Sequence, residues 1–338
     1  MQIYAFGGGL DCCVGVGPLF AEVASFYAVP IAGETPGCVA VNNANSHLEV
    51  PLRDPVTNAA TSIAEGWFHF RHVPGYNAGD NQIVGPGLAN SSGTPVFRIV
   101  RNIQAAADTF TYQAQYWNGT AWVAAFSGTW TVRGAASAFD LYVKIAVAGS
   151  IQIYADGTTI GSVSGIDTSG MSNIATLTLT NGGDGGWGYW GWIVGTGEST
   201  IGHLCRLKQA TANGANVAWT GGFADVGEYP VNDADYIRTA TAGLKSNFTG
   251  PDFAALISGH KIKAVGIGAR VRNSGTVPST LRGTLTIGGT DYTTADCAGV
   301  GAGYGPARML FPLDPSTGLA WGATIADANV PFGVESRT

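Results

Sequence analysis

Hydrophobic and polar residues alternate along much of this chain with the period of two that is typical of β-strands. Between residues 141 and 147 the aliphatic side chains take every second position and fall on one face: Leu141, Val143, Ile145 and Val147. Tyr142 and Lys144 fall on the other face. Residues 151–153 and 177–179 repeat the pattern with Ile and Leu. These aliphatic faces are predicted to point into a core.

Two dipeptides that favour tight turns connect such segments. Asn118-Gly119 follows the aromatic and β-branched run 111–117, and Asp156-Gly157 follows the strand around residues 151–153. Both dipeptides tolerate the positive φ of a hairpin turn, so each predicts an antiparallel hairpin.

The second half of the chain has shorter alternating segments. Residues 264–272 and 281–287 are separated by Asn273-Ser274-Gly275 and are expected to pair with each other, with Arg270 and Arg272 on one face. Residues 253–257 are the best helix candidate, of one or two turns.

Composition favours an all-β protein of two domains. The 338 residues exceed the roughly 250–300 at which single cores stop growing. The 50 glycines and 15 prolines indicate many turns, and the absence of long Ala/Glu/Lys/Leu runs leaves little helix. We therefore expect two tandem antiparallel β-sandwich, jelly-roll-like domains with very little helix. The polar segment 195–200 separates a first domain at 26–198 from a second at 199–338, and the Gly-rich residues 1–25 fit a tethering arm or a first β-strand equally well.

Charge and cysteine content exclude several classes of protein. The net charge of −6 argues against binding to nucleic acid, which needs clustered cations. No apolar run approaches the ~20 residues that span a bilayer, and residues 1–20 lack the basic start of a signal peptide. The five cysteines, odd in number and without C-x-x-C spacing, are expected to be buried thiols rather than disulfides.

Residues 139–145 and 150–158 resemble the central hairpin of concanavalin-like and laminin-G-like jelly rolls. The resemblance extends in outline over residues 30–195 and implies two curved antiparallel sheets packed face to face. That architecture serves glycan binding, glycan hydrolysis and inert scaffolding, so it does not fix a function.

Two phrases in the second domain resemble segments of structural proteins of tailed bacteriophages. One is 311–321, with Phe311-Pro312-Leu313-Asp314-Pro315 at its start, and the other is Trp219-Thr220-Gly221-Gly222-Phe223 with the following 225–237. The resemblance implies a structural component of a virion and carries no catalytic residue. It does not separate a tail or baseplate appendage from a head-decorating or head-fibre protein.

Catalytic and metal-binding patterns are weak throughout. The acids between residues 30 and 195 are scattered, whereas sandwich glycosidases need two opposed carboxylates about 5–9.5 Å apart. His69 and His72 are three residues apart and would face opposite ways in a strand, so they cannot share a metal ion. We therefore expect no catalytic residue and no enzymatic activity.

One acidic loop could supply oxygen ligands to calcium, namely Asp225, Glu228, Asn232, Asp233 and Asp235. Its spacing does not match an EF-hand, and a solvated turn in which Asn232-Asp233 bonds its own backbone is favoured. Calcium is the only cofactor that the sequence suggests.

Aromatic residues crowd a Gly-rich segment, where ring faces could contact a glycan or a neighbouring subunit: Trp187, Tyr189, Trp190 and Trp192, with Asp184 as a hydrogen-bonding partner. Trp190 and Trp192 share a strand face, which is also typical of core residues. Trp and Tyr are enriched at protein interfaces as well.

The first hypothesis for function is a virion structural protein, most simply a tail or baseplate appendage that mediates subunit assembly and contacts host-surface glycan. Its partners would be other virion proteins and further copies of the chain, as in the trimers common in phage fibres, and it would remain in the host cytoplasm until assembly or lysis. The alternatives are a head-decorating protein and a free glycan-binding lectin.

Overall fold

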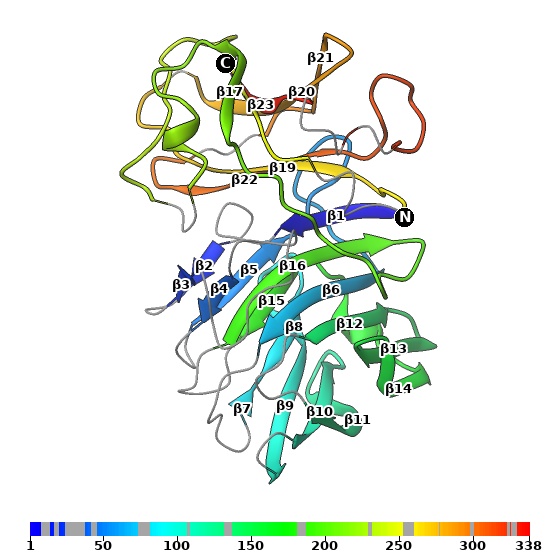
Figure 1. Cartoon of the computed structure of the whole chain (residues 1–338). Helices are drawn as coiled ribbons and strands as arrows, with labels where there is room; N and C mark the ends of the chain where they lie inside the picture. The colour runs from blue at the N-terminus through cyan, green and yellow to red at the C-terminus, as the bar shows by residue number, and fades with distance from the viewer. Residues whose placement is uncertain are drawn as a thin grey trace. The chain divides into compact units, whose positions relative to one another are not determined.

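The computed structural model describes residues 1–7, 14–16, 20–23, 38–41, 46–73, 82–106, 109–131, 137–180, 187–228, 232–252, 260–276, 278–297, 301–322, 325 and 330–338. Figure 1 shows the chain as a succession of β-strands. It divides into two compact units, of which the first holds most of residues 1–205 and the second holds residues 206–338 together with the short segment Asp54–Ala59.

The first unit contains two antiparallel sheets, each of eight strands in the part of the chain that is described (Figure 1). Sheet A has the order β14 (Thr158–Ile166), β13 (Gly149–Ala155), β12 (Ser137–Lys144), β6 (Glu65–Val73), β16 (Trp187–Thr196), β4 (Cys38–Val41) and β3 (Phe20–Val23), and β1 (Gln2–Gly7) also pairs with β16. Sheet B has the order β11 (Trp122–Thr131), β10 (Thr109–Trp117), β9 (Pro95–Ala106), β8 (Gly85–Ala89), β15 (Thr176–Thr180), β5 (His47–Pro51) and β2 (Val14–Val16), and β7 (Gln82–Ile83) pairs with β9.

The alternating pattern places the core of this unit as predicted. Leu141, Val143, Ile151 and Ile153 are fully buried, and so are the leucines of β15. Because directly opposite residues of an antiparallel pair share a face, the pairing of Leu141 with Phe68 and of Phe139 with Phe70 brings these two phenylalanines of β6 into the same core. We call this the inner face of sheet A, and the opposite side its outer face.

Both predicted hairpins are confirmed. The pair β13–β14 turns at Asp156 (φ 47°) and Gly157 (φ 76°), which is the left-handed geometry that Asp-Gly favours. The pair β10–β11 turns at 118–121, where Gly119 has φ 100° and the side chain of Asn118 accepts hydrogen bonds from the backbone.

One detail of the first unit differs from the expectation, and another favours one of two alternatives. Val147 is 75% exposed because β12 ends at Lys144, so the predicted aliphatic face stops before it. Gln2–Gly7 form β1 on the edge of β16, so this part of residues 1–25 is a strand of sheet A and not a tethering arm.

The second unit is also antiparallel. A five-stranded sheet has the order β17 (Ala212–Val217), β18 (Lys245–Thr249), β23 (Phe332–Arg337), β20 (Thr280–Ile287) and β21 (Thr290–Thr293), and β19 (Val265–Val271) pairs with β22 (Gly305–Phe311). Side chains from both sheets form one core, to which Ile267, Leu281, Met309 and Val334 contribute.

The predicted pairing of residues 264–272 with 281–287 is wrong. β19 pairs with β22, whereas β20 pairs with β21 and β23, so residues 272–279 lead from one sheet to the other and do not form a hairpin turn. Arg270 and Arg272 do lie on one face, since both guanidinium groups approach the ring of Tyr304. The helix candidate 253–257 lies outside the described residues.

The protein is therefore an all-β chain of antiparallel β-sandwich architecture. Within the described ranges the helical elements are two short 3-10 turns, Ser169–Met171 and Phe223–Asp225. No helix in these ranges has the length and apolar character needed to span a bilayer.

Candidate functional site

The aromatic segment around residue 190 belongs to the interior. Tyr189, Trp190 and Trp192 are fully buried, so the prediction that their ring faces contact a glycan is wrong. The register of β16 against β6 shifts between Trp190 and Ile193, where Gly191 has a φ of 62°. Trp187 begins β16, and Asp184 lies outside the described residues.

The residues of the predicted calcium loop do not converge on one point. Asp225 accepts a hydrogen bond from the backbone of Gly222, and Glu228 accepts one from the backbone of Asn232. Asp233 forms two hydrogen bonds with Arg270, at 2.7 and 2.9 Å. Asn232 bonds to the backbone two residues on and, at 3.3 Å, to the carboxylate of Asp235. These contacts are those of a hydrogen-bonded turn, and in the described ranges no three His, Cys, Asp or Glu side chains gather as a metal site would require.

Three half-buried aromatic side chains meet instead on the outer face of sheet A. Trp67 of β6 lies 5.0 Å from Tyr142 of β12 and 5.7 Å from Tyr154 of β13, measured between ring centroids, and is tilted by 39° and 33° against them. We call these residues the aromatic cluster. The position opposite Trp67 on β16 is Gly195, and the side chain of Met1 lies where a Cβ of this glycine would point. The cluster therefore forms a partly exposed apolar platform on a rigid sheet.

Hydrogen bonds fix the two tyrosines of the cluster. The Tyr142 hydroxyl donates to Glu65 at 2.7 Å, and the Tyr154 hydroxyl donates to Gln152 at 2.7 Å. Burial, reinforced by the bond to Glu65, raises the pKa of Tyr142 to about 12, so its hydroxyl remains a donor at neutral pH. Because their hydroxyls are held, the rings lose little further freedom when a ligand binds.

A buried polar group borders the cluster. His69 Nδ1 donates to Asp140 Oδ1 at 2.9 Å, and the Thr200 hydroxyl donates to the same oxygen at 2.6 Å. All three residues are at most 1% exposed. Thr200 belongs to residues 197–205, which follow β16 and which we call the strap. The strap is thus anchored on the outer face of sheet A, beside the aromatic cluster.

The His69–Asp140 pair has the geometry of an oriented imidazole. A carboxylate on Nδ1 fixes the ring and leaves Nε2 as the second proton-carrying position, an arrangement used for general acid–base chemistry. Here Nε2 is buried and has no hydrogen-bond partner. His72, by contrast, lies on the inner face between Phe70 and Tyr189, which confirms that the two histidines face opposite ways.

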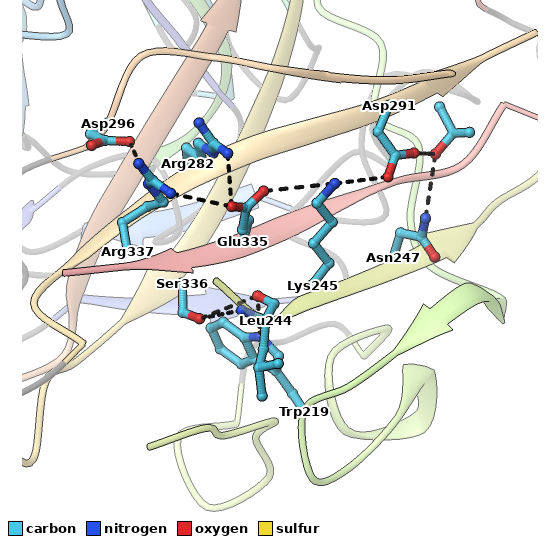
Figure 2. A network of polar contacts seen from close by, with 11 residues as sticks. Trp219, Leu244, Lys245, Asn247, Arg282, Asp291, Asp296, Glu335, Ser336 and Arg337 are labelled. Carbon is cyan, nitrogen blue, oxygen red and sulfur yellow. Dashed lines mark hydrogen bonds and ion pairs between the residues drawn. The ribbon is translucent and has the colours of Figure 1, made fainter. Parts of the chain in front are cut away.

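Figure 2 shows a polar network on the five-stranded sheet of the second unit. The carboxylate of Glu335, on β23, lies 2.7 Å from Arg282, 3.6 Å from Arg337 and 3.9 Å from Lys245. Lys245 also donates to Asp291 at 2.9 Å, and this hydrogen bond holds the pKa of Asp291 below its ordinary value. Glu335 is only 3% exposed, so these cations compensate a buried charge and the network stabilises the sheet.

Both phage-like phrases contribute a tryptophan to the second unit. The indole nitrogen of Trp219 donates to the carbonyl oxygen of Leu244, and that of Trp321 donates to the carbonyl oxygen of Phe311, each at 3.0 Å. Both rings pack against the core of this unit. The phrases therefore carry fold-determining contacts.

Comparison with known proteins finds a likeness in fold but no match in sequence. No protein-family model matches the chain. No curated protein sequence matches it either. One similar solved structure is alginate lyase Aly36B, with 13% sequence identity, coverage of 48% of this chain and 82% of that chain, and a TM-score of 0.35. Another is the endo-β-1,4-glucuronan lyase of Trichoderma reesei, with 14% identity, coverage of 57% of this chain and 94% of that chain, and a TM-score of 0.40. The globular domain of T. cruzi calreticulin is also similar, with 9% identity, coverage of 58% of this chain and 89% of that chain, and a TM-score of 0.41.

These structures overturn the prediction that the chain is not an enzyme, because two of the three are lyases. The likeness concerns the fold alone at these identities and TM-scores. Neither a substrate nor a catalytic residue passes from them to this chain.

Proposed function

We propose that the first unit binds glycan on the outer face of sheet A, through the aromatic cluster. The observation that carries this proposal is the contact of Trp67 with Tyr142 and Tyr154 on three adjacent strands, with all three rings only half buried. Rings that share a sheet face offer a broad apolar surface against which sugar rings can pack, and their polar edges supply hydrogen bonds.

The site of action proposed for this binding is a virion appendage. The support is the resemblance of residues 219–237 and 311–321 to phage structural proteins, and both segments belong to the second unit. In this proposal the second unit would serve assembly with other virion proteins and with further copies of the chain, and the first unit would contact the host surface. A position on the head is the alternative.

The glycan proposal is tested by the affinity of the full chain for a panel of soluble polysaccharides. Trp67→Ala is expected to weaken binding at least about tenfold, because central aromatic residues dominate interface energies. Trp117→Ala is the matched control: it removes a half-buried tryptophan that contacts Trp122 at 5.8 Å on sheet B, and it should leave the affinity unchanged. Equal affinities for wild type and Trp67→Ala would refute the proposal.

Two further measurements complete the test. Release of new chain ends during the same incubation would show that binding leads to cleavage. Antibody labelling of purified phage particles is expected to mark the tail or baseplate, and absence of the protein from the particles would contradict the virion proposal.

A further inference from the structure

The charges beside the aromatic cluster point to a ligand class. Glu65 and Lys144 lie directly opposite each other on β6 and β12, on the same outer face as Trp67 and Tyr142. Both are exposed, and they carry opposite charges. The carboxylate of Glu65 also accepts the bond from Tyr142. Lys144, the cation that follows the cluster on β12, therefore has a carboxylate directly opposite it.

The remaining outward positions beyond the cluster are uncharged. Ser150 and Gln152 of β13 are half buried, and Ser162 and Ser164, their partners on β14, are exposed. Gln152 is directly opposite Tyr142, so a row of hydroxyl and amide groups continues the platform across the sheet. Such groups both donate and accept hydrogen bonds, as sugar hydroxyls do.

Other charges near this face are of both signs, and the cations among them have acidic partners or lie away from the cluster. Asp156 is exposed at the β13–β14 turn, and the strap carries Glu198. The carboxylate of Glu198 lies 3.5 Å from His203 and 3.6 Å from the N-terminal ammonium of Met1. Arg71 is also on the outer face, but the buried His69 lies between it and Trp67 along β6. The side chain of Arg71 packs beside Gly191, near Cys205 at the end of the strap. The cation excess that a polyanionic chain would require is therefore missing from the described part of this face.

On this basis, and resting on the proposed glycan binding, we propose that the ligand of the outer face is a neutral polysaccharide and not a polyuronate. Its sugar rings pack on Trp67, Tyr142 and Tyr154, and its hydroxyl groups bond to the serine and glutamine row. A polyuronate would bring its carboxylates towards Glu65, and the cation beside the cluster, Lys144, already lies opposite that carboxylate.

The experiment measures binding of the full chain to a soluble neutral glucan, a soluble mannan and a polyuronate, at about 0.05 M and about 0.5 M NaCl. We expect a neutral polymer to bind with less than about twofold change in affinity between the two salt concentrations, and Lys144→Ala to bind it as wild type does. Trp67→Ala and Tyr154→Ala should each lose at least about tenfold in affinity. Circular dichroism of each variant verifies its fold.

The outcomes separate the two proposals. Binding to the polyuronate alone, weakened by salt and by Lys144→Ala but still lost in Trp67→Ala, would overturn the neutral ligand class and leave glycan binding at the cluster intact. Binding to none of the polymers, or binding that both aromatic variants retain, would overturn the ligand class together with the proposed function.

Discussion

Buried His72 should make the first unit less stable in mild acid. The side chain lies among Phe70, Phe139 and Tyr189, and burial lowers its pKa from 6.5 to about 3 although a hydrogen bond with the backbone of Ser137 opposes the shift. In the unfolded chain the imidazole takes up a proton below pH 6.5, whereas in the folded chain it stays neutral down to about pH 3. Stability is therefore lost as the pH falls through this window.

The size of the effect follows from the gap between the two pKa values. Each pH unit inside the window changes the free energy of unfolding by up to about 1.4 kcal/mol, so His72 alone should remove about 2 kcal/mol between pH 7 and pH 5. His72→Phe keeps an aromatic ring in the core but cannot titrate. The difference in unfolding free energy between wild type and His72→Phe is expected to shift by about 2 kcal/mol over this range, in favour of the variant at pH 5.

Urea unfolding followed by tryptophan fluorescence measures this difference. Of the nine tryptophans, only Trp219 and Trp321 lie in the second unit, so the signal reports mainly on the first. His72→Leu should show the same pH dependence of the unfolding free energy as His72→Phe, because both variants lack the titrating imidazole. Its unfolding free energy should differ from that of His72→Phe by an amount that does not change with pH, since Leu packs differently in the core. Parallel stability curves for wild type and both variants from pH 7 to pH 5 would refute the reasoning.

Three further predictions concern stability. Thr200→Val removes a hydrogen bond to a buried carboxylate and should cost about 2 kcal/mol in urea unfolding and expose the strap to protease; unchanged unfolding would contradict the anchoring role. Asp291→Asn removes a carboxylate whose pKa is lowered in the folded chain by the hydrogen bond from Lys245. The charged carboxylate stabilises the wild type above about pH 4, and this contribution should be lost as the pH falls below about 4, whereas the variant should show no such loss. Thermal melts of both proteins at pH 3 and pH 6 make the comparison. A Cβ at Gly333 would lie 2.1 Å from a backbone oxygen of β18, so Gly333→Ala should destabilise the second unit by more than about 3 kcal/mol. Gly275→Ala is the control and should leave the melting temperature unchanged, because no atom lies within 4 Å of a Cβ at that position.

Local patterns of the sequence predict the strands of this chain well. The alternation at Leu141 and Val143, and the turn at Asp156-Gly157, depend on neighbouring residues only, and both are found in the structure. Pairing over longer distances is not encoded so locally. The turn-like Asn273-Ser274-Gly275 suggested a hairpin, yet β19 pairs with β22, more than thirty residues further along the chain.

The same distinction explains why the sequence drew attention to aromatic residues that the structure buries. Crowding around Trp190 attracted attention, but Tyr189, Trp190 and Trp192 are fully buried, and the ring of Tyr189 contacts Phe70 and His72 of the neighbouring strand β6. Trp67 and Tyr142 are 75 residues apart and become neighbours only through the register of β6 against β12. The available signal was that Trp67 and Tyr142 are sequence neighbours of Phe68 and Leu141, whose side chains point into the core. Because successive side chains of a strand point to opposite faces, Trp67 and Tyr142 are predicted to lie on the face turned away from the core.

A crystal structure of the full chain soaked with a neutral oligosaccharide tests glycan binding on sheet A most directly. The account predicts sugar rings lying over Trp67, Tyr142 and Tyr154, with hydroxyl groups bonded to Gln152 or Ser162. An ordered sugar bound elsewhere on the chain, with the aromatic cluster left bare, would contradict it.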